Sequence, residues 1–152
     1  MKPNNLIEHP EGGRFQEVFR SVERITRADG VGRSALTHIY FSLNKGEVSR
    51  FHKVQADEVW NLYQGTGLYL YIWDGSESAV EKIELSAESG AFCYVVPAGY
   101  WQAAEPIDEK VLVGCSVGPG FEFEDFELID PDSTLAETLQ TNDPSMTKFI
   151  AP

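Results

Sequence analysis

The chain of 152 residues carries 24 acidic and 12 basic side chains, which gives a formal net charge of −12 at pH 7. This charge argues against nucleic acid and anionic membranes as partners, because both bind clustered Lys and Arg. The sequence shows no apolar signal segment and no stretch as long as a membrane span, so we expect a cytoplasmic protein. Its two cysteines, Cys93 and Cys115, lie in apolar runs and are expected to be reduced and buried.

The predicted elements are mostly short strands, at 14–22, 35–43, 48–54, 57–63, 67–74, 79–85, 91–96, 111–117 and 121–128. Within 67–74 the residues Leu68, Leu70 and Ile72 alternate with aromatic residues, as expected for a strand with two distinct faces. Short strands separated by Gly and Pro turns, without a βαβ rhythm, predict an all-β jelly-roll barrel. One helix is predicted at 133–141, where Thr134 and Glu137 have the spacing of a capping box.

The first polar motif spans residues 46–65 and contains Gly46, His52, Glu58 and Gly65. Alternate residues of a strand share one face, so position 54, which is a valine, lies on the same side as His52. A bend after that strand would return Glu58 to this side, with the glycines at the turns. The arrangement is open to three interpretations: half of a metal site, an acid–base pair, or a buried polar pair.

A second motif spans residues 90–102, where Gly90 precedes a short apolar run, a Pro97-Ala-Gly99 turn and Gln102. Proline fixes its own φ angle, and glycine supplies a positive φ angle, so this unit predicts a tight turn between two strands. The turn would place Gln102 and Trp101 at the mouth of the barrel.

These two segments resemble the first and second motifs of the cupin superfamily. The strings HPEGG at 9–13 and PGFEFEDF at 119–126, with THIYF at 37–41 and DEVW at 57–60, are similar to an RmlC-like single-domain branch of poorly defined function. The resemblance covers about residues 6–128 and implies one cupin domain, a double-stranded β-helix, followed by a C-terminal helix and tail at 129–152. Val54 and Gln102 stand where the family's metal motifs have histidines.

The resemblance implies a metal set of His52, Glu58 and Gln102, which contains one imidazole and is weak for a transition ion. We therefore expect no cofactor or a weakly bound divalent metal. His38 could supply another ligand if it points inward, and strand parity leaves its direction open. Without metal, His52 and Glu58 are the expected catalytic acid–base pair, because such groups transfer protons near neutral pH.

Two functions follow from this set. One is an isomerase, epimerase or lyase that acts on a small polar, sugar-like metabolite; related cupin epimerases act on keto-sugars, which is fold analogy alone. The other is a non-catalytic barrel that binds or senses such a ligand. The side chains expected to bind the ligand are Gln102, Trp101, Trp60, Tyr63, Tyr40 and His38.

Several of these aromatic residues have a structural alternative. Trp60 is expected to belong to the core, whereas Trp101 is expected to line the pocket. His9 and Glu11 are interpreted as tying down the HPEGG turn, with a functional role as the alternative. The phenylalanines of 121–126 are expected to pack. A homodimer is expected, because an extra N-terminal strand and an aromatic sheet leave edges and faces that a second copy would cover.

Overall fold

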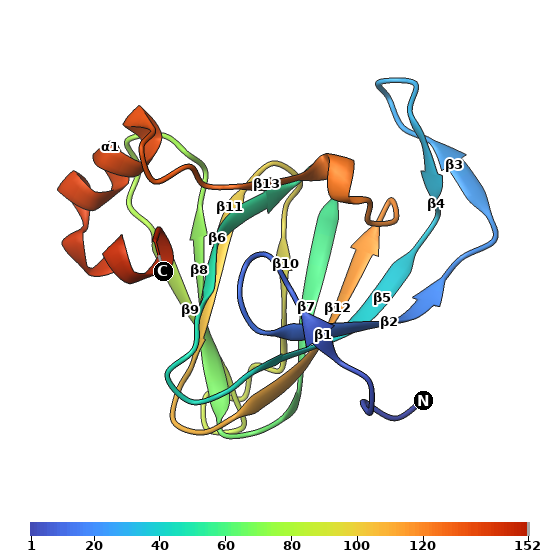
Figure 1. Ribbon diagram of the computed structural model, residues 1–152, viewed down its shortest axis with the longest axis horizontal. Helices are drawn as coiled ribbons and strands as arrows, with labels where there is room; N and C mark the ends of the chain where they lie inside the picture. The colour runs from blue at the N-terminus through green and yellow to red at the C-terminus, as the bar shows by residue number, and fades with distance from the viewer. Residues whose placement is uncertain (152) are drawn as a thin grey trace.

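The computed structural model describes residues 1–151, and antiparallel strands dominate it (Figure 1). The strands are β1 (Ile7–Glu8), β2 (Arg14–Arg20), β3 (Arg24–Thr26), β4 (Gly32–Ser34), β5 (Thr37–Leu43), β6 (Ser49–Val54), β7 (Asp57–Gln64), β8 (Gly67–Trp73), β9 (Glu81–Ser86), β10 (Cys93–Val96), β11 (Trp101–Pro106), β12 (Val111–Gly118) and β13 (Phe126–Leu128). The helical segments are η1 (Phe123–Asp125), α1 (Thr134–Asn142) and η2 (Pro144–Phe149).

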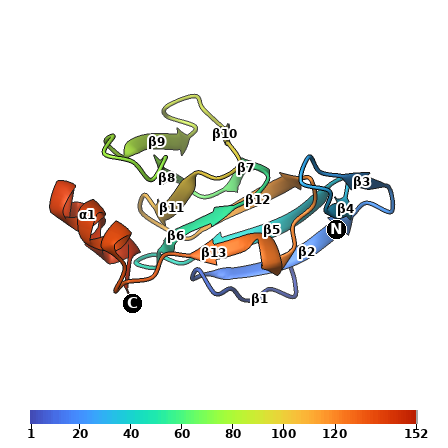
Figure 2. The same cartoon turned by 90° about the horizontal axis from the view of Figure 1, so that it is seen from above.

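Two sheets form the barrel, as the strand pattern predicted. One has six strands in the order β1-β2-β5-β12-β7-β10, and the other has five in the order β13-β6-β11-β8-β9. Viewed from above, the sheets face each other, with the β3–β4 hairpin projecting at one end and the C-terminal helices lying at the other (Figure 2). Among residues 1–151, no helix is both long and apolar enough to cross a membrane.

The core confirms the alternation seen in 67–73. Leu68, Leu70 and Ile72 are buried in the cluster between the two sheets. Tyr71 and Trp73 face the opposite side of the same strand, where they join a second buried cluster with residues of α1 and η2. The five-stranded sheet is therefore covered on both faces, and the C-terminal segment serves as its outer layer.

Helix α1 lies within one residue of its predicted range, but its cap differs. Ser133, not Thr134, is the N-cap residue, and its side chain accepts a hydrogen bond from the backbone N–H of Ala136. The predicted capping box is therefore absent, because the N-cap lies one residue earlier and the residue three positions after it is Ala136. Ser133 in turn donates to the carbonyl of Asp130, which fixes the turn before the helix.

Strand β11 and the β3–β4 hairpin were not predicted. β11 pairs on both sides, with β6 and β8, although its sequence WQAAEP has few residues that favour strands. Its conformation is set by the neighbouring strands and not by local preference. Near the chain's end the predicted strand 121–128 is split into η1 and the short β13, because residues 123–125 make one helical turn.

The two cysteines have different surroundings. Cys115 is buried, as predicted, whereas Cys93 is exposed, so the expectation that both lie in the core was wrong for Cys93. Strand β10 lies at the edge of the six-stranded sheet, and Cys93 is opposite the partly exposed Asn61 of β7. It therefore faces away from the barrel interior.

Candidate acid–base site in the barrel

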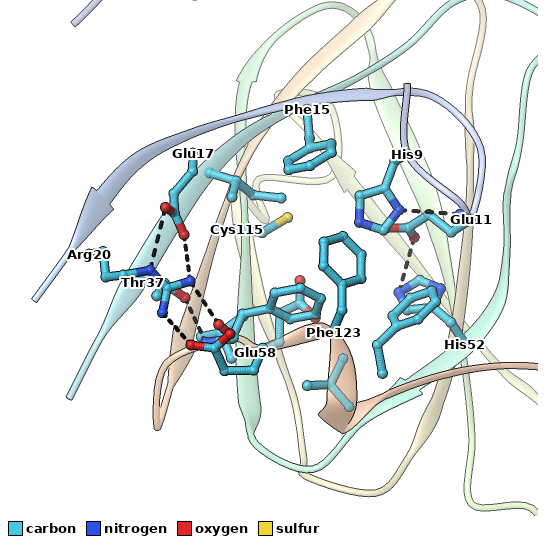
Figure 3. A pocket seen from close by; sticks show the side chains of 16 residues that line it. His9, Glu11, Phe15, Glu17, Arg20, Thr37, His52, Glu58, Cys115 and Phe123 are labelled. Atoms are coloured by element: carbon cyan, nitrogen blue, oxygen red, sulfur yellow. Dashed lines mark hydrogen bonds and ion pairs between the residues drawn. The ribbon is translucent and has the colours of Figure 1, made fainter. Parts of the chain in front are cut away.

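A cavity of about 240 Å³ opens between the inner face of the six-stranded sheet and the segment of residues 121–126 (Figure 3). This volume is slightly below the roughly 300–1,000 Å³ of pockets that hold drug-sized ligands, so it suits a small metabolite. Inward-facing residues of β5 and β12 form one wall, namely Thr37, Ile39, Cys115 and Val117. His52 and Val54 on β6 and Glu58 on β7 also line it.

The HPEGG turn delivers a carboxyl group into this cavity. Gly12 and Gly13 have φ angles of 112° and 68°, which few other residues adopt. A Cβ atom on Gly12 would lie 2.2 Å from the carbonyl oxygen of Val48, so only glycine allows the turn to approach β6 this closely. The backbone N–H of Arg50 donates to the carbonyl of Glu11 at 2.8 Å. The turn is thus held against β6, with Glu11 beside His52.

Glu11 is almost fully buried and touches three polar side chains. Its Oε2 atom accepts a short hydrogen bond from the hydroxyl of Ser49 and lies 3.0 Å from Nε2 of His52. Its Oε1 atom lies 3.1 Å from Nδ1 of His9. The carboxyl group of Glu11 therefore lies between two imidazole rings.

The hydrogen-bond partners of both rings fix where their protons lie. Nδ1 of His52 is 2.7 Å from the carbonyl oxygen of Arg50, which can only accept, so this nitrogen carries a hydrogen. Nδ1 of His9 accepts the backbone N–H of Glu11 at 3.2 Å, so this nitrogen has a lone pair. In their neutral forms, both rings therefore point a lone pair at Glu11. A proton on Oε2 of Glu11 can donate to Nε2 of His52, while the lone pair of His9 accepts the backbone N–H of Glu11.

The pKa shifts agree with a protonated Glu11. Burial raises the pKa of Glu11 to about 8, although the Ser49 hydrogen bond opposes the change. Burial also lowers the pKa of His52, and it lowers the pKa of His9 to about 3, with the nearby His52 adding to the effect. At neutral pH the cluster consists of a carboxylic acid and two neutral imidazoles.

Glu58 is the second carboxyl group deep in the cavity. Its Oε1 atom accepts a hydrogen bond from Nε2 of Gln102 at 3.0 Å, and Oε1 of Gln102 accepts one from the indole N–H of Trp60 at 2.6 Å. Burial raises the pKa of Glu58 to about 7, although the nearby His52 opposes this rise. Burial and the neighbouring Glu58 also raise the pKa of the Cys115 thiol, which stays protonated.

Aromatic side chains form the wall opposite the sheet. Phe121, Phe123 and Phe126 line the cavity together with Phe15 of β2, and Phe126 stacks on His52 with ring centroids 5.5 Å apart. These rings were expected only to pack, so their place in the cavity is a feature that the sequence interpretation missed. The sequence did contain a signal for this aromatic wall, because the PGFEFEDF string carries three phenylalanines close together.

The aromatic wall is anchored from outside the cavity. Asp125 in η1 accepts two hydrogen bonds from Arg33 of β4, each at 2.8 Å, and lies 2.9 Å from Nη1 of Arg27. Arg33 and Asp125 are both buried. The β3–β4 hairpin thereby fixes the position of the segment that carries the phenylalanines.

Polar groups occupy two separate sides of the cavity in Figure 3. His9, Glu11 and His52 lie on one side, and Glu17 and Arg20 lie on the other, with Phe123 between them. Arg20 donates from Nη1 to Glu122 at 2.9 Å, and from Nη2 to Glu17 at 2.8 Å. Its Nη2 also donates to the carbonyl of Phe121. The guanidinium is therefore already paired with two carboxylates.

The structure brings together His52, Glu58 and Gln102 but not the rest of the predicted set. Gln102 is buried behind Glu58 and does not line the cavity. Trp60 lies in the core between the sheets, as its structural interpretation predicted, and does not line the cavity as its ligand-binding assignment required. Trp101 belongs to the cluster under the C-terminal helices, so its expected place in the pocket was wrong. Its strand β11 turns this ring to the outer side of the five-stranded sheet.

The other predicted ligand-binding residues lie on the outer face of the six-stranded sheet. Nε2 of His38 is 3.0 Å from the hydroxyl of Tyr63, and its Nδ1 is 2.7 Å from the hydroxyl of Ser116. The rings of Tyr40 and Tyr63 meet edge to face on this surface. His38 points outward and cannot reach His52. Strand parity had left the direction of His38 open, and none of the three side chains lines the cavity in which they were expected to bind a ligand.

The side chains around His52 do not fit a divalent metal site. One imidazole nitrogen of His52 is bound to a carbonyl and the other faces Glu11, while Glu58 is bound by Gln102. Val54, on the same face, offers no ligand atom. Within residues 1–151, no group of three or more His, Cys, Asp or Glu side chains is arranged to hold a metal ion. The metal set that the resemblance implied is not assembled.

A small antiparallel barrel with polar groups from adjacent strands in its interior is the architecture of a cupin. The chain belongs to the family described as Cupin superfamily (DUF985), whose model matches residues 1–129. It is similar to protein SO0799 from Shewanella oneidensis, with 32% identity over 97% of this chain and 92% of that chain, and a TM-score of 0.83.

Two further relatives match nearly the whole chain. A hypothetical protein from Leishmania major has 27% identity over 95% of this chain and 90% of that chain, with a TM-score of 0.78. The uncharacterized protein YML079W of Saccharomyces cerevisiae has 28% identity over 96% of this chain and 81% of its own length. Enzymes such as oxalate decarboxylase from Bacillus subtilis share only the fold, at 14% identity and a TM-score of 0.60.

Proposed function

We propose that this protein is an enzyme of the isomerase, epimerase or lyase kind, which moves a proton on a small polar metabolite bound in the barrel. The observation that carries the proposal is the position of the Glu11 carboxyl group, buried between the rings of His9 and His52 inside a cavity of metabolite size. A group that holds a proton at neutral pH yet can release it is suited to general acid–base catalysis.

The two buried carboxyl groups would have different catalytic roles. Glu58, with a pKa of about 7, is partly ionised at neutral pH and can accept a proton from carbon. Glu11, with a pKa of about 8, can donate its proton to a carbonyl oxygen or a leaving group. The Ser49 hydroxyl, which donates to Oε2, would stabilise the resulting Glu11 carboxylate, and the proton that Glu58 takes from carbon balances the one that Glu11 gives up. Two groups whose surroundings give them different roles are a recurring feature of acid–base enzymes.

A second candidate is a barrel that binds or senses a ligand without changing it. It is favoured by one observation, namely that Glu11 already has a polar partner at both oxygens through Ser49, His9 and His52. A buried polar network whose members satisfy one another stabilises a fold without any need for substrate. The neutral cluster would then only shape the floor of the binding site.

Turnover of metabolites by purified variants separates the two candidates. For a substrate found by screening carbonyl-containing metabolites, Glu11→Gln and Glu58→Gln should each lower kcat by about 10²–10⁴-fold while binding changes by less than about tenfold. Tyr63→Phe is the matched control, because it removes a hydroxyl next to an imidazole on the outer face. Full activity in both glutamine variants would refute the proposed chemistry, and ligand binding without any turnover would favour the binding barrel.

A further inference from the structure

The charges around the cavity indicate which ligands it accepts. Four carboxyl groups line it, those of Glu11, Glu17, Glu58 and Glu122. Within residues 1–151, Arg20 is the only Lys or Arg among the lining residues. A cavity with this balance attracts cations and repels anions, and the net charge of −12 on the whole chain acts in the same direction.

Arg20 does not offer an anchor for an anionic ligand. Each of its three guanidinium nitrogens already donates to an acceptor, to Glu17 from Nε and Nη2 and to Glu122 from Nη1. Together these three side chains carry a net charge of −1 when ionised. A carboxylate or phosphate that bound there would lie close to both Glu17 and Glu122, whose charges would repel it.

The aromatic wall adds a second attraction for a cation. Phe121, Phe123 and Phe126 contact one another at angles between 69° and 83°, and Phe15 joins them across the cavity. The face of an aromatic ring carries partial negative charge, so it attracts an ammonium group that has left water. Rings combined with a carboxylate are a suitable environment for an organic cation.

Glu58 is the charge best placed to pair with such a group. It is 7% exposed and lines the cavity, and Gln102 fixes its Oε1 atom from behind. An ammonium group carries only donors, which matches a carboxylate that accepts. Glu11 is different, because its carboxyl group lies against two neutral imidazole rings and carries no charge while it is protonated.

We propose that the cavity selects small organic ammonium compounds, in which an amine is attached to a compact apolar body, with Glu58 as the counter-ion and the phenylalanines of 121–126 around the apolar part. This inference deepens the proposed function, on which it rests for the identity of the site, by naming the substrate class. It excludes sugar phosphates and carboxylic acids as substrates.

Binding of three matched probes tests the inference without any turnover. Benzylamine, benzyl alcohol and benzoate share one ring and differ in charge, so their dissociation constants compare a cation, a neutral molecule and an anion. Ligand-observed NMR titrations at about pH 7.5, between the pKa values of Glu58 and Glu11, should show benzylamine binding at least about tenfold more tightly than benzyl alcohol, or roughly 1.4 kcal/mol. Benzoate should bind most weakly.

Two glutamine variants locate the charge that is responsible. Glu58→Gln should bring benzylamine to within about threefold of benzyl alcohol, whereas Glu11→Gln should keep the tenfold preference. Glu127→Gln, on the exposed side of β13, is the control and should leave every ratio unchanged.

Several results would overturn the inference: benzoate binding as tightly as benzylamine, the preference surviving in Glu58→Gln, or no saturable binding of any probe to the wild-type protein. The wild-type ratios decide the matter even if Glu58→Gln does not fold. Failure here is distinguishable from failure of the acid–base proposal. An anionic substrate whose turnover needs Glu11 would refute only the ammonium preference, and an amine preference without Glu11-dependent turnover would refute only the catalysis.

Discussion

The two faces of the six-stranded sheet carry similar residue types with different consequences. The inner face presents Glu58, Cys115 and Thr37 to the cavity, where burial shifts pKa values strongly. The outer face presents His38 and Tyr63 at the surface, hydrogen-bonded to each other and 47% exposed at the tyrosine. A single step along a strand separates the two sets, since Thr37 faces inward and His38 outward.

This comparison shows that burial, and not residue type, makes the side chains of the inner face candidates for acid–base chemistry. Desolvation raises the pKa of Glu11 to about 8 on the inner side, while on the outer side the pKa of His38 is lowered by its partial burial. Strongly shifted carboxyl groups in a cavity are the usual mark of a functional site. The following substitutions test the contrast between the two faces.

The largest effect is expected in the pH dependence of stability at Glu11. Its folded-state pKa of about 8 lies above the unfolded value of 4.5, so its contribution to stability is fully present below pH 4.5 and is lost as the pH rises through about 8. Glu11→Gln has no proton to lose. Urea unfolding between about pH 5 and 8 should therefore show wild-type stability falling relative to the variant, by a few kcal/mol at most.

The outer face supplies the control for this measurement. Tyr63→Phe should follow the wild-type curve in parallel across the same range, because the pKa of Tyr63 is raised from 10.0 and lies outside it. Parallel curves for wild type and Glu11→Gln would show that Glu11 is not held protonated.

The two histidines have the opposite effect on stability at lower pH. The pKa values of His9 and His52 are lowered in the folded state, so their contributions to stability are present above pH 6.5 and are lost on acidification.

Removing Asp125 tests whether the hairpin holds the aromatic wall over the inner face. Asp125→Ala leaves Arg33, a buried side chain, without its two charged hydrogen bonds, so we expect a loss of about 2–3 kcal/mol in the free energy of unfolding. Glu127→Ala is the matched change at an exposed ion pair with Lys53 and should cost less than about 1 kcal/mol. Equal costs for the two variants would contradict a special role for Asp125.

Much of the fold could be predicted because it depends on local patterns. The alternation in 67–73 identified both buried faces of β8, and Gly46, Gly65 and Gly99 do adopt positive φ angles at turns. Strand β11 was missed because only its two neighbours make WQAAEP extended. A conformation imposed by pairing leaves no signal in the segment's own sequence.

The site could be predicted only in part, for a similar reason. The spacing of His52 and Glu58 was informative, but the partner of His52 is Glu11, which comes from a turn distant in sequence. Its approach depends on the space left by Gly12 against Val48. The direction of His38 was undetermined because strand parity needs a known register, and one residue of shift exchanges the faces.

On the outer face, the substitution Gly114→Ala tests how closely the ring of Tyr63 packs against the sheet. A Cβ atom there would lie 2.3 Å from Cε2 of Tyr63, whose ring covers this glycine. Gly114→Ala should cost about 1–3 kcal/mol in the free energy of unfolding, because the ring must move and lose its bond to His38. In the Tyr63→Ala background the same substitution should cost much less, so a double-mutant cycle measured by urea unfolding should show strong coupling. Additive costs would mean that the ring does not rest on Gly114.

The smallest expected effect concerns a homodimer, which we propose to form through this outer face. Val95 of edge strand β10 is 52% exposed and lies opposite Val59, and Tyr63 lies on the same face. Apolar and aromatic side chains on an open sheet are suited to stacking against a second copy, which would bury them. The inner face cannot serve this purpose, because its side chains are already covered by the aromatic wall.

Val95→Lys should weaken this dimer by about tenfold, or roughly 1.4 kcal/mol, since a lysine in the middle of an apolar contact must be desolvated. Sedimentation equilibrium at micromolar concentration measures the change. Val22→Lys is the matched control, because Val22 is 91% exposed in the loop between β2 and β3. A wild-type species of 17.0 kDa would contradict the dimer itself, and equal weakening by both lysine variants would mean that the contact lies elsewhere.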